Sequence, residues 1–296
     1  MEDKEIQFDD FKVRCSAISK VLSNSRSNPQ LTEKQAETLE KYRNRLEGGE
    51  VLSPKMAAEM VTLVEKEANG KKIILSDTCI EYLMEEYAWK TEGCIPVNKK
   101  TQEMLAVKKG IIVEQMSGKL LSLVDGVEYK THKERIYNEY LSGEIDFYDG
   151  EHVYAARVIN DNKASWDYPI FLKKLHTGLE SGQEEQLQGY GDITGAKELY
   201  VSNTLVDTPE EIIEEMQYRL SKKLGCVTLE DPEFLKEWPI WVRSMTFTRI
   251  PIHKRVHKIK IEPFSEFDRQ KVYDRVKVCR EWLNNFHEDY QKWNLQ

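Results

Sequence analysis

Hydrophobic residues recur at helical spacing through much of the first 123 residues, and capping signals divide this region into separate helices. The predicted helices cover residues 32–47, 53–67, 77–89 and 101–123. Thr32 and Gln35 form a capping box, and Ser76 is a typical N-cap residue. The fourth helix is expected to break near Gly110, and it has an apolar stripe along one side with Glu114 beside that stripe.

From residue 135 onward, apolar and polar residues alternate with the period of two that is typical of strands. The predicted strands cover residues 135–140, 145–148 and 153–162. Asp149-Gly150 is a strong hairpin signal between the last two of them. These segments are therefore expected to form an antiparallel meander of three strands.

The second half of the chain alternates helices with strands. Helices are predicted over residues 168–194, with a break near Gly182, and over residues 208–223 and 266–293. Strands are predicted over residues 199–206 and 255–261. The whole pattern predicts an α/β fold with two parts. Residues 1–73 form an N-terminal helical segment, and residues 74–296 form a core with a mixed central sheet, flanked by helices and closed by a long C-terminal helix.

Composition excludes several classes of protein. The chain has 296 residues and a formal net charge of −8. No run reaches the about 18–20 apolar residues of a membrane helix, and the acidic N-terminus lacks the apolar stretch of a secretory signal. Five scattered cysteines suit reduced thiols, so we expect a cytoplasmic protein without a membrane partner. The negative charge argues at first against a nucleic-acid partner, because such proteins usually have a basic face.

Three residues around the predicted hairpin suggest chemistry. Asp161 and Lys163 are two apart on one strand and therefore face the same way, and the hairpin can bring Asp146 beside them. Two adjacent carboxylates favour a cation between them, and oxygen ligands suit Mg²⁺ or Mn²⁺. This set is typical of metal-assisted phosphodiester hydrolysis. A surface hairpin with solvated charges is the competing interpretation.

Four motifs occur in order along the chain. They are a helix from Gly110 to Glu114, the segment GEID ending at Asp146, the segment VINDNKASWD over residues 158–167, and QLQGY from Gln186 to Tyr190. This order resembles the PD-(D/E)xK nuclease superfamily, specifically its phage-encoded, RecB-like and lambda-type (YqaJ-like) exonuclease branch. The resemblance covers residues 75–290 and, more faintly, residues 13–16. It implies a restriction-endonuclease-like fold.

The resemblance also implies roles for individual residues. The metal ligands would be three carboxylates and one main-chain carbonyl, those of Glu114, Asp146, Asp161 and Asn162. Lys163 would be the catalytic lysine and Gln186 would orient the site or the scissile strand. Tyr190 would either contact DNA or pack the helix on the sheet. Arg14 and Ser16 would either hold a terminal phosphate or serve only as the start of a helix.

The function implied is that of a Mg²⁺- or Mn²⁺-dependent deoxyribonuclease, an exonuclease of phage recombination or replication acting on linear duplex DNA or its ends. A phage single-strand annealing or single-strand-binding protein and a second copy of the chain would be its partners. Cys226 and Cys279 are single and distant, so no iron–sulfur cluster is expected.

One departure keeps an alternative open. In members of that superfamily the residue corresponding to Asn162 is usually apolar. Asn160 adds a second polar residue to the same strand. The alternative is therefore a catalytically inactive DNA-binding or protein-interaction module with the nuclease fold.

The distribution of charge alters the first impression of an acidic protein. Residues 249–260 contain five basic residues and no acidic one, Arg255 and Lys258 among them. DNA contact is therefore expected to be local, along this predicted strand. Four further lysines extend the expected path, namely Lys99, Lys100, Lys108 and Lys109.

Overall fold

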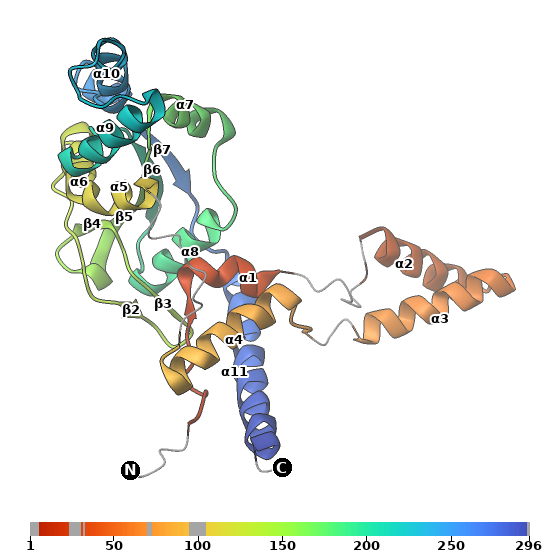
Figure 1. Cartoon of the computed structure of the whole chain (residues 1–296). Helices are drawn as coiled ribbons and strands as arrows, with labels where there is room; N and C mark the ends of the chain where they lie inside the picture. Colours follow the sequence, from red (N-terminus) through yellow and green to blue (C-terminus); the bar gives the residue numbers. More distant parts are fainter. Residues whose placement is uncertain (1–5, 24–30, 32, 70–72, 95–104, 295–296) are drawn as a thin grey trace.

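The computed structural model describes residues 6–23, 31, 33–69, 73–94 and 105–294. Its centre is a four-stranded sheet in the order β4-β5-β6-β7 (Figure 1). The strands are β4 (Phe147–Gly150), β5 (Ala156–Ala164), β6 (Glu198–Thr204) and β7 (Val256–Ile261). β5 pairs antiparallel with β4 and parallel with β6, and β7 is antiparallel to β6. The predicted mixed central sheet is therefore confirmed.

Helices cover both faces of this sheet. α6 (Glu114–Asp125) packs on one face and α8 (Gln183–Thr194) on the other. Gly118 of α6 lies directly against the ring of Phe147, and a Cβ at this position would come within 2.6 Å of that ring. A glycine here therefore allows α6 to approach β4 closely.

The remaining helices of this part are α5 (Leu105–Ile112), α7 (Tyr168–Thr177), α9 (Glu210–Leu224) and α10 (Pro232–Met245). The helix predicted over residues 101–123 is two helices, and the break falls at Val113 and not at Gly110. Residues 101–104, where that predicted helix begins, lie outside the described residues. Because of the break at Val113, Glu114 is the first residue of α6 and does not lie midway along a longer helix.

The predicted three-stranded meander is wrong. β2 (Ile136–Tyr137) and β3 (Leu141–Gly143) form a separate small sheet, in which β1 (Val13–Arg14) pairs parallel with β3. The chain bends at Asp146 before β4 begins. All three residues of β3 are buried, and β3 pairs with β1, a strand from the distant N-terminus. Local alternation of apolar and polar residues does not reveal such a partner.

One large core joins the N-terminus to the rest of the chain. α1 (Ile18–Leu22), α4 (Asp77–Glu92) and α11 (Glu266–Asn294) pack together around it. Phe8 and Val13 are fully buried in the same cluster as Leu187 of α8. The predicted N-terminal segment, residues 1–73, is therefore not a single unit. Its residues 8–21 contribute to the core of the part that contains the central sheet, which we call the body.

The other part of that segment is a helical hairpin of α2 (Glu33–Glu47) and α3 (Pro54–Asn69), which projects from the body (Figure 1). It has its own small cluster of Leu39, Tyr42 and Leu63. Where the chain leaves the body and returns to it, the hydroxyls of Ser23 and Ser76 hydrogen-bond to each other.

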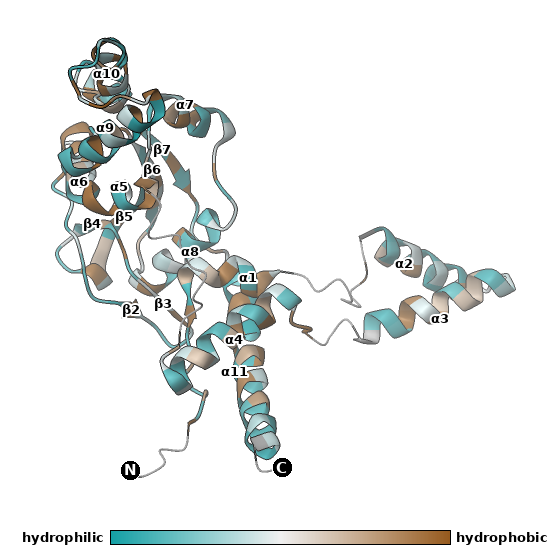
Figure 2. Cartoon of the chain, viewed as in Figure 1, coloured by the Kyte–Doolittle hydropathy of each residue, from teal (hydrophilic) through white to brown (hydrophobic). Residues whose placement is uncertain are grey.

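The long C-terminal helix predicted from the sequence is present as α11. Hydrophilic and hydrophobic residues alternate in colour along it (Figure 2), as expected for a helix with one face on the core. Within the described parts of the chain, no helix combines the length and the apolar character that crossing a membrane requires.

Candidate active site

The bend before β4 places Asp146 beside the end of β5. Phe147 pairs with Asn160 across the two strands, so the preceding Asp146 reaches the next residues of β5. The N–H of Asn162 donates a hydrogen bond to Asp146 Oδ2 at 2.7 Å. Lys163 Nζ lies 2.6 Å from Asp161 Oδ2. The structure therefore brings together the three residues that the hairpin pattern had singled out.

The two carboxylates lie close together, Asp161 buried and Asp146 half-buried. The Asp161 side chain is 2% exposed. Burial, and then the charge of Asp161, raise the pKa of Asp146 to about 7, although Lys163 and the Asn162 N–H act in the opposite direction. Burial by itself would lower the pKa of Lys163, but the charges of Asp161 and Asp146 outweigh it and raise that pKa. Lys163 is thus held as a cation between acids.

Glu114 approaches the same site from α6. The break at Val113 makes it the first residue of that helix. Its charge adds to the effects that raise the pKa of Asp146, so a third carboxylate acts electrostatically on the pair.

Gln186 on α8 connects the acids to the helix beneath them. Its Nε2 donates to Asp161 Oδ1 at 3.2 Å and to the hydroxyl of Tyr190 at 2.8 Å. Tyr190 is 4% exposed and packs on Gly143, where a Cβ would come within 2.4 Å of the ring. Of the two roles considered for Tyr190, packing agrees with this burial. A ring so deeply buried cannot meet a nucleic acid, which corrects its assignment to DNA contact.

Arg14 and Ser16 lie at the junction of β1 and the short helix η1 (Cys15–Ala17), which packs on α8. Arg14 forms an ion pair with Glu86 at 3.0 Å, and 43% of its side chain remains exposed. Ser16 is exposed. Both side chains are therefore reachable from solvent on the α8 side of the sheet.

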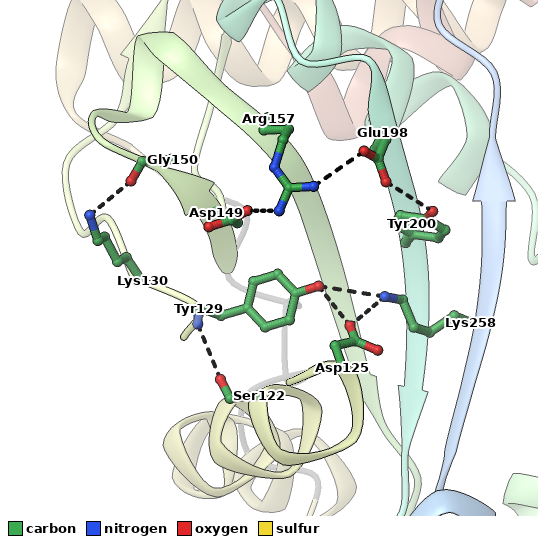
Figure 3. Close-up of polar contacts among 10 residues, drawn as sticks. All are labelled: Ser122, Asp125, Tyr129, Lys130, Asp149, Gly150, Arg157, Glu198, Tyr200 and Lys258. Carbon is green, nitrogen blue, oxygen red and sulfur yellow. Dashed lines mark hydrogen bonds and ion pairs between the residues drawn. The ribbon is translucent and has the colours of Figure 1, made fainter. Parts of the chain in front are cut away.

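Lys258 of β7 is held in a polar network on the other face of the sheet (Figure 3). Its ammonium forms an ion pair with Asp125 at 2.5 Å and lies 4.2 Å from the centre of the Tyr200 ring. The Tyr129 hydroxyl donates to the same carboxylate at 2.6 Å. Because Asp125 neutralises this charge on the α6 face, Lys258 is not placed as a free phosphate contact near Asp161. The geometry disagrees with its predicted role in DNA binding.

The other basic residues that were predicted to contact DNA lie in different surroundings. Arg255 precedes β7, and its buried Nε has no hydrogen-bond partner among the described residues. Lys108 lies 3.6 Å from Glu211. Lys109 is 1% exposed, so it does not belong to a surface path. Lys99 and Lys100 lie outside the described residues.

Of the two unusual asparagines of β5, Asn160 is buried and Asn162 is half-buried, and the side-chain oxygen of each accepts a hydrogen bond. Thr204 Oγ1 donates to Asn162 Oδ1 at 2.9 Å, and Ser202 Oγ donates to Asn160 Oδ1 at 2.6 Å. Both partners belong to β6 and face α6. The sequence contained a signal for this pairing that was missed, namely the alternation of Ser202 and Thr204 on the neighbouring strand. Asn162 therefore does not disrupt the strand that positions Asp161 and Lys163.

The residues at this site suit a hard divalent cation by their chemistry. They are oxygen donors, and the buried Asp161 Oδ2 is paired with the Lys163 ammonium at 2.6 Å. In the described ranges, no group of three or more His, Cys, Asp and Glu side chains is already arranged to hold a metal ion. The fit therefore rests on the chemistry of these oxygen donors.

Comparison with known proteins agrees with this description at the level of the fold. The sequence matches no protein-family model and no curated protein. The structure is similar to a phage-related exonuclease from Haemophilus somnus 129PT, with a TM-score of 0.58 and 18% identity over 95% of this chain and 97% of that one.

It is also similar to the alkaline exonuclease LHK-Exo from Laribacter hongkongensis, with a TM-score of 0.52 and 10% identity over 96% of this chain and 93% of that one. That exonuclease has also been solved in complex with dAMP. The chain thus has the fold of phage-related and alkaline exonucleases over nearly its whole length, as the motif order had indicated.

Proposed function

We propose that this chain is a metal-dependent deoxyribonuclease, and specifically an exonuclease of phage recombination or replication. The observation that carries the proposal is the group of the buried Asp161 with the half-buried Asp146 and Lys163, joined to α8 through Gln186. Buried acids around one lysine are costly to the fold, and such groups concentrate at functional sites. The shared exonuclease fold supports the same reading.

The proposed ligands for Mg²⁺ or Mn²⁺ are Glu114, Asp146, Asp161 and the main-chain carbonyl of Asn162. A divalent cation bound there supplies Lewis acidity toward a scissile phosphate. Gln186 holds the Asp161 carboxylate through its Oδ1, which leaves Oδ2 directed toward the site.

Lys163 has an electrostatic role in this proposal. In the metal-free protein the charges of Asp161 and Asp146 raise the pKa of Lys163, which favours the protonated ammonium. As a charged donor it can hold the attacking water by hydrogen bonds and stabilise the negative charge that develops on the phosphate.

Action at DNA ends would use the segment after β1. Arg14 and Ser16 are accessible beside α8, and Arg14 would exchange Glu86 for a terminal phosphate. DNA is therefore the proposed substrate, with a single-strand annealing or single-strand-binding protein and further copies of this chain as partners. A cytoplasmic site of action goes with this role.

The test is digestion of linear duplex and single-stranded DNA in Mg²⁺ and in Mn²⁺. Lys163→Ala is expected to lower kcat by about 100-fold or more, because it removes a charged donor from the transition state. Lys277→Ala, which changes an exposed lysine on α11, serves as the matched control and should retain full activity. If the wild-type protein and Lys163→Ala are equally inert with both metals, the enzyme proposal fails. The inactive nuclease-fold module would then be the correct reading.

A further inference from the structure

A second lysine lies beside the proposed active site. Lys174 is in the last turn of α7, and its side chain is 19% exposed, whereas the adjacent Lys173 is exposed. Lys174 Nζ lies 4.0 Å from Glu180 Oε1. None of the four motifs includes either Lys174 or Glu180.

The connections of α7 keep this lysine near Lys163. Only residues 165–167 separate β5 from α7, and Asp167 caps the helix by accepting a hydrogen bond from the Ile170 N–H at 2.8 Å. After α7 the chain turns back through Gly178 and Gly182, which both have positive φ, into the helix that carries Gln186. Lys174 therefore lies on a short path between two elements of the site.

Glu180 is held on the turn between α7 and α8. Its N–H donates to Gln183 Oε1 at 2.9 Å, and the Gln183 N–H donates to the Glu180 carbonyl at 3.2 Å. These reciprocal bonds fix the backbone of Glu180, while its side chain is 64% exposed. The carboxylate can therefore move away from Lys174 without disturbing the turn.

The charges of these groups act on one another. Burial lowers the pKa of Lys174, Glu180 opposes this effect, and the nearby Lys163 ammonium lowers the pKa further. Glu180 also contributes to the raised pKa of Lys163. The Glu180 carboxylate thus acts on both ammonium groups, and among the described residues it is the acid that raises the pKa of Lys174.

We propose that Lys174 binds a backbone phosphate of the substrate strand adjacent to the scissile one, and that Glu180 occupies the place of this phosphate in the free protein. A carboxylate and a phosphodiester both offer a singly charged pair of oxygens to an ammonium group. The exposed side chain of Glu180 makes the exchange inexpensive. This inference rests on the proposed nuclease function, because it requires a nucleic-acid strand across Lys163.

The test measures binding of an end-labelled duplex oligonucleotide by fluorescence anisotropy with Ca²⁺ in place of Mg²⁺, so that no turnover is needed. Lys174→Gln is expected to weaken binding about tenfold and to reduce the slope of log Kd against log salt by about 0.9, the value for one phosphate. Lys173→Gln is the matched control and should change Kd by less than about twofold. Glu180→Gln should tighten binding, because it removes the competitor.

The opposite signs for Lys174 and Glu180 separate this inference from a general effect of charge or of folding. Equal effects of Lys174→Gln and Lys173→Gln would overturn it, and so would weaker binding by Glu180→Gln or no DNA binding by the wild type. Thermal melting of each variant excludes unfolding, and Lys174→Arg should restore affinity. If the variants behave as expected but the wild type never cleaves DNA, the proposed function fails and the phosphate contact stands.

Discussion

At the scale of single residues, Lys109 is a charged side chain that is almost completely buried. It is 1% exposed, and its ammonium donates to the Trp166 carbonyl at 2.8 Å and lies 5.3 Å from the centre of the Phe247 ring. Burial lowers the pKa of Lys109 to about 8, although Asp167 and Asp207 oppose the shift. Lys109 thus joins α5 to the segment that follows Lys163.

This lowered pKa predicts how stability depends on pH. Between pH 8 and the ordinary lysine pKa of about 10.4, the unfolded chain binds a proton at Lys109 that the folded chain has lost, so this group makes stability rise with pH. Lys109→Met lacks the effect. The stability of the wild type relative to Lys109→Met should therefore increase by about 2 kcal/mol between pH 7 and pH 10.

Urea unfolding at several pH values measures this difference, and Lys108→Met is the control for an exposed lysine. Parallel stability curves for the wild type and Lys109→Met would show that Lys109 titrates normally. The sequence did not reveal this burial, because a lysine between Lys108 and Gly110 has nothing local that distinguishes it from a surface residue.

At the scale of elements, side-chain contacts fix the C-terminal end of α6, and this bears on the position of Glu114. Its first residue is Glu114, and its last residue, Asp125, bonds to Lys258 of β7 and to Tyr129 (Figure 3). Because a helix moves as a unit, the contact at its far end helps to hold Glu114 toward Asp146. We therefore assign Lys258 a structural role.

This assignment predicts different results for two lysines of β7. Lys258→Met should lower the free energy of unfolding by about 1–2 kcal/mol, because Asp125 would be left half-buried without its cation. Lys260→Met should be close to neutral, since that pair with Glu262 is exposed. Urea unfolding gives the stabilities and anisotropy gives the DNA affinities. A large loss of affinity in Lys258→Met alone, without destabilisation, would restore its role in DNA binding.

The elements were largely predictable because periodicity is local. The strand of Asp161 and Lys163 and the hairpin that brings Asp146 to them follow from alternation and the Asp-Gly signal, although Asp149 and Gly150 are the last residues of β4 and the turn comes after them. The two-residue strand β1 does not, because its partner β3 lies more than 120 residues away and two residues have no period. The burial of Tyr190 was also hidden, since it depends on Gly143 of that distant sheet.

At the scale of the whole molecule, the segment between Ser23 and Ser76, which contains α2 and α3 and which we call the excursion, leaves the body and returns to it at the same place. Ser23 and Ser76 hydrogen-bond where the chain leaves and returns, and the Arg275 guanidinium donates to the carbonyls of Val21 and Ser23 at 3.1 and 3.2 Å. The body therefore fixes both ends of the excursion without using the contacts within the hairpin.

A deletion tests this independence. Replacing residues 24–74 by two glycines, so that Ser23 is followed by the linker and Leu75, should leave a folded body with unchanged nuclease activity per molecule. Thermal melting and the DNA digestion assay are the measurements, and deletion of α11, which packs on the core of the body, is the control that should not fold. Failure of the hairpin deletion to fold would show that the hairpin supports the body.

The closure at Ser23 and Ser76 also has a consequence for evolution and engineering. An excursion whose two ends meet behaves as an insertion cassette, so its length can change without altering the order of the strands or the register of the sheet. Chains of this architecture can therefore differ greatly in length at this point and still share one body. The Gly48-Gly49 turn at the far end of the hairpin is correspondingly suited to accept a fused domain or a fluorescent label.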